Sequence, residues 1–199
     1  MALRVADPIA SSTEEATRSR ILDAAFACAG RIGLVRTTMS DVAREARLSR
    51  QTVYRYFASK HDLLMALVIR EEEVLMTSVR TAIEPHREIR PAVEAAFRTI
   101  LRAMRAHPLL DRVMATEPHE LLPYLTIEAN PIREMGIRMM EEVFATRMEG
   151  VSPMLAHRAA EISSRLVTSY AIMPPDDDPD VVAGQLAELV CNGLGKKEP

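Results

Sequence analysis

A short stretch at residues 49–60, with the sequence SRQTVYRYFASK, gathers side chains that can recognise nucleic-acid bases. The guanidinium of Arg50 can bind the N7 and O6 atoms of guanine with two hydrogen bonds, and the amide of Gln51 can bind adenine in the same manner. The ring of Tyr54 can pack on a thymine methyl group. This combination predicts a surface that reads DNA sequence.

Neighbouring residues carry groups that suit phosphate oxygens. Thr52 and Tyr56 supply hydroxyls that can donate to a DNA backbone. Lys60 stands at the predicted start of a helix, where free N–H groups and the helix dipole already favour an anion. Thr38 and Ser40, at the start of an earlier predicted helix, offer the same chemistry to the other strand.

Helical spacing determines which of these side chains share a face. Ser49 can cap a short helix, and Val53 and Phe57, one turn apart, can hold that helix against its neighbours. The base-reading residues, together with Thr52 and Arg55, then lie on or beside the outer face. The alternative is that this face is merely solvated. Tyr54 or Tyr56 could then be a core residue that exposes only its hydroxyl. Composition alone favours neither interpretation.

The elements that must position this face are short helices with clear start signals. A serine or threonine followed three residues later by an acid is typical of a helix N-terminus. Such signals open three of the first four predicted helices, at Ser12 with Glu15, Thr38 with Asp41, and Ser59 with Asp62, and Ser49 alone can cap the third. Residues 38–57 thus form helix, tight turn and helix, the layout of a helix-turn-helix whose second member enters the major groove.

The rest of the chain is punctuated by proline and also predicts helices. The fourth helix runs from residue 59 to about 83 and ends before Pro85. We found no β-type alternation and no internal repeat, so the fold class is predicted to be all-α. The later helices are expected at 89–107, 109–116, 118–129, 131–149, 153–173 and 179–194.

The totals favour a DNA-binding protein of the cytoplasm. Of the 199 residues, 48% are apolar, enough for a sizeable core. Residues 1–60 carry ten Lys or Arg against six Asp or Glu, whereas residues 61–199 carry fifteen against twenty-two. A basic first part on an acidic body suits a nucleic-acid partner. Cys28 and Cys191 show no pairing pattern, which indicates a reducing compartment. No apolar run approaches the ~20 residues of a membrane span, so we expect no membrane contact.

The stretch TTMSDVAREARLSRQTVYRYFASKHDLL, residues 37–64, resembles the DNA-binding head of TetR-family repressors. The resemblance implies a homodimer whose protomers combine such a head with a larger helical body that holds an effector pocket. We accordingly expect a disordered arm at 1–12, a DNA-binding domain at 13–58 and an effector-binding and dimerisation domain at 59–199. The DNA-binding set implied by the motif comprises Thr38, Ser40, Arg47, Ser49, Arg50, Gln51, Thr52, Tyr54, Arg55, Tyr56 and Lys60.

Within that set, the resemblance implies that Arg50, Gln51 and Tyr54 face bases. It implies that Thr38, Thr52, Tyr56 and Lys60 face phosphates. Ser40 fits less well, because the family often has a longer side chain at that position. Arg47 stands where such motifs often have glycine. We expect the turn to tolerate it, with Arg47 adding a positive charge on the side of the DNA backbone.

Two further surfaces are expected in the body. Apolar stripes on the last two helices predict a four-helix interface with a second copy, although they could instead cover the protomer's own core. This interface set is Leu155, Ala159, Ile162, Leu166, Tyr170, Val182, Leu186 and Leu189. A Met-rich cavity suits flexible apolar ligands, although such a stripe could also be plain core. The predicted cavity set is Phe97, Met104, His107, Met114, Leu121, Tyr124, Leu125, Met135, Met139 and Phe144.

Other chemistry finds little support. The segment Glu117–Glu120, with His107 and Asp111 nearby, matches no established metal signature, and there is no phosphate loop or nucleophile elbow. We therefore predict no metal, no cofactor and no enzyme. The predicted function is a ligand-responsive regulator, a repressor that binds a near-palindromic DNA operator as a dimer and is released by a small, mainly apolar effector. The alternatives are a small-molecule-binding protein whose head is only structural, and a helical enzyme of unfamiliar chemistry.

Overall fold

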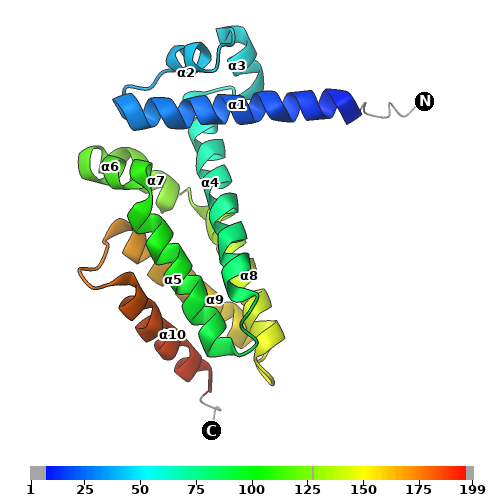
Figure 1. Cartoon of the computed structure of the whole chain (residues 1–199), viewed down its shortest axis with the longest axis vertical. Helices are drawn as coiled ribbons and strands as arrows, with labels where there is room; N and C mark the ends of the chain where they lie inside the picture. Colours follow the sequence, from blue (N-terminus) through cyan, green and yellow to red (C-terminus); the bar gives the residue numbers. More distant parts are fainter. Residues whose placement is uncertain (1–7, 127, 196–199) are drawn as a thin grey trace. The chain divides into compact units, whose positions relative to one another are not determined.

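The computed structural model describes residues 8–126 and 128–195. Over these residues the chain forms helices and no strand, which confirms the all-α fold class (Figure 1). The helices are α1 (Pro8–Ile32), α2 (Met39–Glu45), α3 (Arg50–Tyr56), α4 (Lys60–Ile83), α5 (Ile89–Ala106), α6 (Pro108–Thr116), α7 (Pro118–Leu125), α8 (Asn130–Arg147), α9 (Pro153–Ile172) and α10 (Pro179–Gly195).

Most helix ends lie within two residues of the predicted positions, and two do not. α1 begins at Pro8 rather than at Ser12, so residues 8–12 are helical and not part of a disordered arm. Proline suits the first turn of a helix because the N–H that it lacks would have no partner there. The remainder of the predicted arm, residues 1–7, lies outside the described residues. α7 ends at Leu125 instead of continuing to 129, because Pro131 in the first turn of α8 requires a new helix start.

The chain divides into two compact units, Met1–Val68 and Ile69–Pro199. We call residues 8–68 the head and residues 69–195 the body. The division falls inside α4, ten residues beyond the predicted domain boundary at 58/59. The first two turns of α4 belong to the head and carry Leu63, Leu64 and Leu67, all of them buried.

The head is built on α1, which packs against α2, while α2 packs against α3. Its core is made of small and medium apolar side chains, with Ile21, Val42 and Val53 fully buried. The guanidinium of Arg31 on α1 lies 2.7 Å from the carboxylate of Glu45 on α2. This exposed ion pair adds little stability, so the short helices depend on apolar packing and on their caps.

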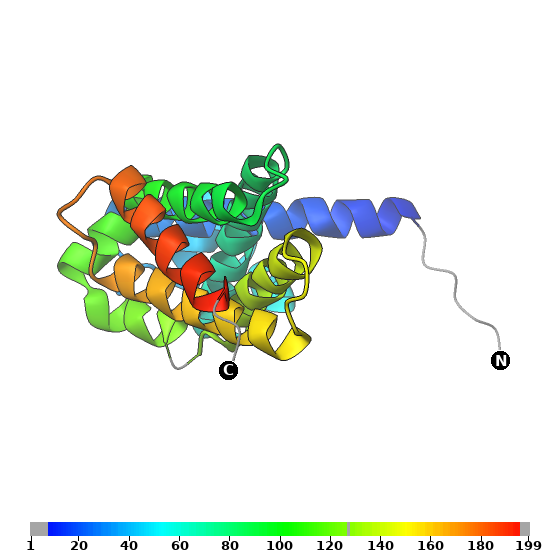
Figure 2. The same ribbon diagram turned by 90° about the horizontal axis from the view of Figure 1, so that it is seen from below.

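The body consists of two main helix pairs. α10 lies along α5, and α8 lies along α9, as the view from below shows (Figure 2). Phe97 and Phe144 are fully buried in the core of this unit. Burying such a side chain contributes roughly 1.5–3 kcal/mol each. In the described part of the chain, no helix has the length and apolar character needed to cross a membrane.

Candidate functional site

The N-termini of α2 and α3 are held by side-chain caps. The Thr38 hydroxyl accepts a hydrogen bond from the backbone N–H of Asp41 (3.2 Å), and the Asp41 carboxylate accepts from the backbone N–H of Thr38 (3.1 Å). The hydrogen bonds from the Thr38 hydroxyl and N–H lower the pKa of Asp41. The Ser49 hydroxyl accepts from the N–H of Thr52 (3.0 Å). Both caps were expected from sequence, and the Thr38 hydroxyl was also expected to face a phosphate.

The outer face of α3 carries the predicted base-reading side chains. Arg50, Gln51 and Tyr54 are exposed, and Tyr54 is unusual for an aromatic residue in having 43% of its surface accessible. Arg50 stacks over the Tyr54 ring at 5.8 Å from its centroid. On the inner face, Val53 and Phe57 are buried, as the helical spacing predicted. α3 therefore presents a preassembled arginine–aromatic pair to solvent, which suits insertion into a major groove.

The remaining members of the predicted DNA-binding set are more mixed in environment. Ser40 and Arg55 are exposed, with Arg55 stacked over the Tyr56 ring at 5.4 Å, and Tyr56 and Thr52 are half-buried. All of these residues stay within the head, close in sequence to the exposed face of α3. That their hydroxyls and positive charges contact phosphates remains a prediction.

Lys60 makes contacts that the sequence did not predict. Its ammonium group donates to the backbone carbonyls of Leu34 (2.5 Å) and Val35 (3.0 Å) in the loop between α1 and α2. In the same loop, the buried hydroxyl of Thr37 donates to the carbonyl of Gly33 (2.7 Å). Lys60 thus ties the start of α4 to the loop that leads into α2, a positioning role that sequence spacing did not reveal.

The turn between α2 and α3 contains Arg47 with a φ of 54°. This is the left-handed region, which costs a non-glycine residue roughly 1–2 kcal/mol. The turn holds arginine where such motifs often have glycine, and it does so in this costly conformation. The side chain of Arg47 is exposed.

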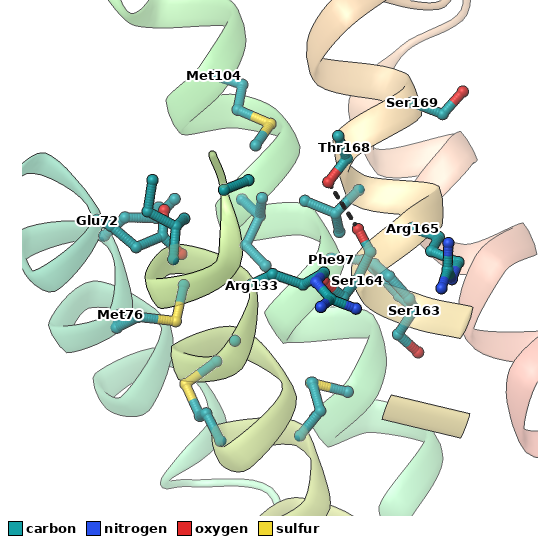
Figure 3. Close-up of a pocket in the computed structure, with 18 of the residues that line it drawn as sticks. Glu72, Met76, Phe97, Met104, Arg133, Ser163, Ser164, Arg165, Thr168 and Ser169 are labelled. Atoms are coloured by element: carbon teal, nitrogen blue, oxygen red, sulfur yellow. Dashed lines mark hydrogen bonds between the residues drawn. The ribbon is translucent and has the colours of Figure 1, made fainter. Parts of the chain in front are cut away.

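The body contains a cavity of about 630 Å³. It lies within the range of pockets that hold drug-sized ligands, roughly 300–1,000 Å³. Its wall is mainly apolar, with Met76 from α4, Phe97 and Met104 from α5, and Met139 from α8 (Figure 3). α9 contributes a row of hydroxyls to the opposite wall, including Ser164 and Thr168. The arrangement can enclose an apolar molecule and hydrogen-bond to one part of it.

The structure brings three of the predicted cavity residues together at this wall, Phe97, Met104 and Met139. Five others lie elsewhere. Phe144, Met135 and Tyr124 pack away from the cavity, and Met114 is half-buried outside it. His107 caps α6 through its Nδ1, which accepts from the N–H of Leu110 (3.1 Å). The side chains of Leu121 and Leu125 lie outside the described part of the structure.

Several polar residues of the cavity wall were missed by sequence reasoning. Glu72 belongs to a run of three acids that looks solvated, yet it lies on the same helical stripe as the buried Met76 and Val79. That periodicity is a signal that could have identified it. The hydroxyl-rich segment 163–169 on α9 was a second available signal, because solvated helices seldom need serine and threonine at such density.

The predicted interface stripe needs correction. Ala159, Val182 and Leu186 are buried inside the protomer's own core, so they are not available for contact with a second copy. Leu155, Leu166 and Tyr170 are partly buried against that core. In contrast, Ile162 and Leu189 expose 55% and 63% of their surfaces. Exposed apolar side chains on the same two helices that were not predicted are Met154 and Val181.

Comparison with known proteins identifies the head and the body separately. Residues 21–67 match the family described as bacterial regulatory proteins, tetR family. Residues 88–192, more than half of the chain, match the family described as bacterial tetracyclin repressor, C-terminal domain. The chain belongs to the TetR family. It is therefore a helix-turn-helix transcriptional regulator, and the predicted resemblance is confirmed.

The chain is similar to helix-turn-helix transcriptional regulators of other bacteria. The chain is 29% identical to the transcriptional regulator AlkX of Mycobacterium tuberculosis over 77% of this chain and 73% of the relative. It is 30% identical to the transcriptional repressor KstR of Rhodococcus jostii over 74% of this chain and 66% of that protein.

Solved structures agree with this assignment. The TetR-family repressor AlkX from Dietzia sp., implicated in biodegradation of n-alkanes, superposes with a TM-score of 0.73 at 30% identity and covers 88% of this chain and 96% of its own. FadR of Thermus thermophilus, solved in complex with lauroyl-CoA, has a TM-score of 0.64 at 22% identity, covering 92% and 97% of the two chains. The second likeness shows a shared fold.

Proposed function

We propose that this TetR-family regulator represses transcription by binding a near-palindromic operator as a homodimer, and that a small, mainly apolar effector releases it. The observation that carries the proposal is the exposed Arg50–Tyr54 pair on α3, together with a separate cavity in the body. In this proposal DNA reading and ligand binding use distinct sites, as a ligand-responsive repressor requires.

DNA recognition is proposed to centre on α3. Arg50 and Gln51 are exposed near its N-terminus, where a recognition helix presents side chains to base edges. Stacking on Tyr54 restrains the Arg50 guanidinium before binding, which reduces the side-chain entropy lost on contact with guanine. Arg47 and Arg55 add positive charge on either side, and we propose that they face phosphates.

A homodimer is proposed from the exposed apolar side chains of α9 and α10. Ile162 and Leu189 are large apolar residues left open to solvent in the protomer. Association with a second copy would remove this apolar surface from water. In a dimer, two heads about one DNA turn apart, roughly 34–36 Å, would bind successive major grooves of an inverted repeat.

The effector is proposed to be an amphipathic molecule with a long apolar part. The cavity wall is rich in methionine, which adapts to flexible chains. At its edge, Arg133 and Arg165 provide guanidinium groups for an acceptor or anionic group. The acyl-CoA ligands of the FadR proteins from Thermus thermophilus and Bacillus subtilis support an acyl-like chemistry in this fold. Such a ligand can release DNA only by binding more tightly to the arrangement that does not fit the operator.

The first experiment is selection of the purified protein on a randomised duplex pool at two salt concentrations. We expect enrichment of an inverted repeat, because a dimer reads two related half-sites. Arg50→Ala should relax base preference at one position of each half-site and cost about 1–3 kcal/mol of binding free energy. The matched control is Arg87→Ala, which removes an exposed arginine of the body.

The outcomes separate the proposal from its alternative. If no sequence is enriched and binding vanishes as salt rises, the head contributes charge alone, and a small-molecule-binding protein with a structural head becomes the better account. If an inverted repeat is enriched but Arg87→Ala weakens binding as much as Arg50→Ala does, α3 is not the reading element.

A further inference from the structure

The cavity of the body has polar groups on two sides and an apolar middle. Glu72 of α4 lies on one side, and Ser164 and Thr168 of α9 lie on the other (Figure 3). The side chains of Met76 and Phe97 belong to the apolar wall of the same cavity. A ligand that fills this space therefore meets a carboxyl group as well as a cluster of hydroxyls.

The carboxyl group of Glu72 belongs to the wall of the cavity. Within residues 8–126 and 128–195, it has no hydrogen-bond or ion-pair partner, although it is half-buried. Burial raises the pKa of Glu72 to about 7. The adjacent Glu71 differs, because its carboxylate lies 3.0 Å from Arg70 and 3.7 Å from the imidazole of His107. Glu72 is thus the acid of this run that faces the cavity without compensation.

The opposite side of the cavity has an excess of positive charge. Arg133 lies 3.8 Å and Arg165 2.7 Å from the same oxygen of Glu161, so one carboxylate serves two guanidinium groups. Arg133 also donates to the side-chain oxygen of Asn130 (3.0 Å). One unit of positive charge remains available for an anionic or acceptor group of a ligand.

A ligand with a plain hydrocarbon end would solvate the Glu72 carboxyl less well than water does. Replacing water at the carboxyl by a methyl group removes its solvation and supplies no hydrogen bond, so binding of such a ligand is weakened. A hydroxyl avoids this cost in both protonation states, because it donates to a carboxylate and accepts from a carboxylic acid. The side chain of Glu72 therefore discriminates between ligand ends of similar size.

We infer that the effector is polar at both ends: its anionic or acceptor group binds at Arg133 and the hydroxyls of α9, and a hydroxyl or similar hydrogen-bond donor at its other end binds Glu72. Glu72 is then a specificity-determining residue of the cavity. The inference rests on the proposed function, since it names the chemical class of the effector proposed above.

The test compares two probes of equal chain length, dodecanoate and 12-hydroxydodecanoate, by titration calorimetry on the full-length protein without DNA. We expect the hydroxylated probe to bind roughly tenfold more tightly to the unaltered protein, equivalent to one good buried hydrogen bond. In Glu72→Leu the ratio should fall to about one, because the apolar side chain no longer requires a donor. Glu73→Leu, on the exposed neighbour, should keep the wild-type ratio.

Two further variants guard against misfolding as an explanation. Glu72→Gln keeps a hydrogen-bonding side chain of the same size and should retain much of the preference for the hydroxylated probe. Arg133→Gln should weaken both probes by a similar factor and leave their ratio intact. The inference is overturned if the unaltered protein prefers dodecanoate or binds the two equally, if the preference survives in Glu72→Leu, or if neither probe binds.

Operator release is measured separately, so the two proposals can fail independently. A Glu72-dependent preference without release of DNA supports the inference and contradicts effector control. Release of DNA by both probes alike, without dependence on Glu72, supports effector control and overturns the inference.

Discussion

Arg47 adopts a conformation that side chains other than glycine seldom adopt. Its φ is 54°, and it lies in the turn that connects α2 to α3. The family pattern often has glycine here, and the structure gives the reason: a Cβ atom in this region approaches the following carbonyl oxygen. The arginine is therefore kept at a cost in stability, which its exposed positive charge can offset if it faces DNA.

We expect Arg47→Gly to stabilise the head and to weaken DNA binding. Relief of the left-handed strain should exceed the greater chain entropy of glycine, leaving a net gain of about 0.5–1 kcal/mol in the free energy of unfolding. Loss of one phosphate contact should lower the salt slope of DNA binding by about one. Urea unfolding and salt-dependent titrations measure the two effects. Arg47→Ala, which keeps the strain, should lose affinity without gaining stability.

Glu72 predicts a pH dependence of stability. Burial raises its pKa from 4.5 to about 7, so the folded protein holds this proton more tightly than the unfolded chain does. Below pH 4.5 Glu72 is protonated in both states and does not lower the free energy of unfolding. As the pH rises from 4.5 to about 7, ionisation of the unfolded chain lowers this free energy progressively, and above about pH 7 the loss is complete. Glu72→Gln should thus gain stability relative to the unaltered protein between pH 5 and pH 8, by at most about 2–3 kcal/mol. A difference that is constant with pH would contradict this prediction.

At the scale of elements, α3 is too short to be stable by itself. An isolated helix of its seven residues is far below the ~12–15 residues at which helices become marginal in water. It exists because Ser49 caps its N-terminus and because Val53 and Phe57 are buried in the head. The cap and the buried side chains also determine which face of α3 is exposed. The stability of α3 and its orientation therefore depend on the same residues.

Removing the cap should therefore affect folding and DNA binding together. Ser49→Ala should cost about 1 kcal/mol in the free energy of unfolding, because the N–H of Thr52 loses its partner. Operator affinity should fall as well, since the first turn of α3 frays, and the salt slope should change little. Chemical unfolding and DNA titration are the measurements. Ser19→Ala, on the exposed face of α1, is the control and should change neither quantity by more than about 0.5 kcal/mol.

At the scale of the whole molecule, each unit has its own core and its own task. The head buries the inner faces of α1 to α3, and the body buries α5, α8, α9 and α10 around Phe97 and Phe144. What the protomer leaves exposed is as informative as what it buries. Ile162 and Leu189 remain open on α9 and α10, and a second copy is the occupant that we propose for them.

We expect Leu189→Lys to weaken dimerisation without unfolding the protomer. The side chain is exposed in the protomer, so a lysine there costs nothing in the core, but it would place an unpaired charge in a dimer interface. Sedimentation velocity should show a shift toward monomer, and binding to an inverted repeat should weaken. Val74→Lys, at an equally exposed apolar residue of α4, should leave the mass unchanged. Equal effects of the two substitutions would count against this surface.

The sequence by itself determined where most helices begin and end and which family the head belongs to. These features are local: a capping residue, a proline or a helical stripe acts over a few neighbours, so the pattern is present in the chain before it folds. The motif at 37–64 is local in the same sense. For this reason the bounds of α2 and α3 and the inward positions of Val53 and Phe57 followed from residue spacing.

Only the tertiary structure decided what each helix face meets. The sequence shows that Phe144 and Met139 are apolar residues of one helix. Tertiary packing buries both in the core but brings only Met139 to the cavity wall. Tertiary packing also places Glu72 at the cavity wall and buries Val182 in the protomer's core. It brings Lys60 to loop carbonyls 25 and 26 residues away in sequence. Helical periodicity defines a face, whereas the partner of that face depends on contacts between segments far apart in the chain.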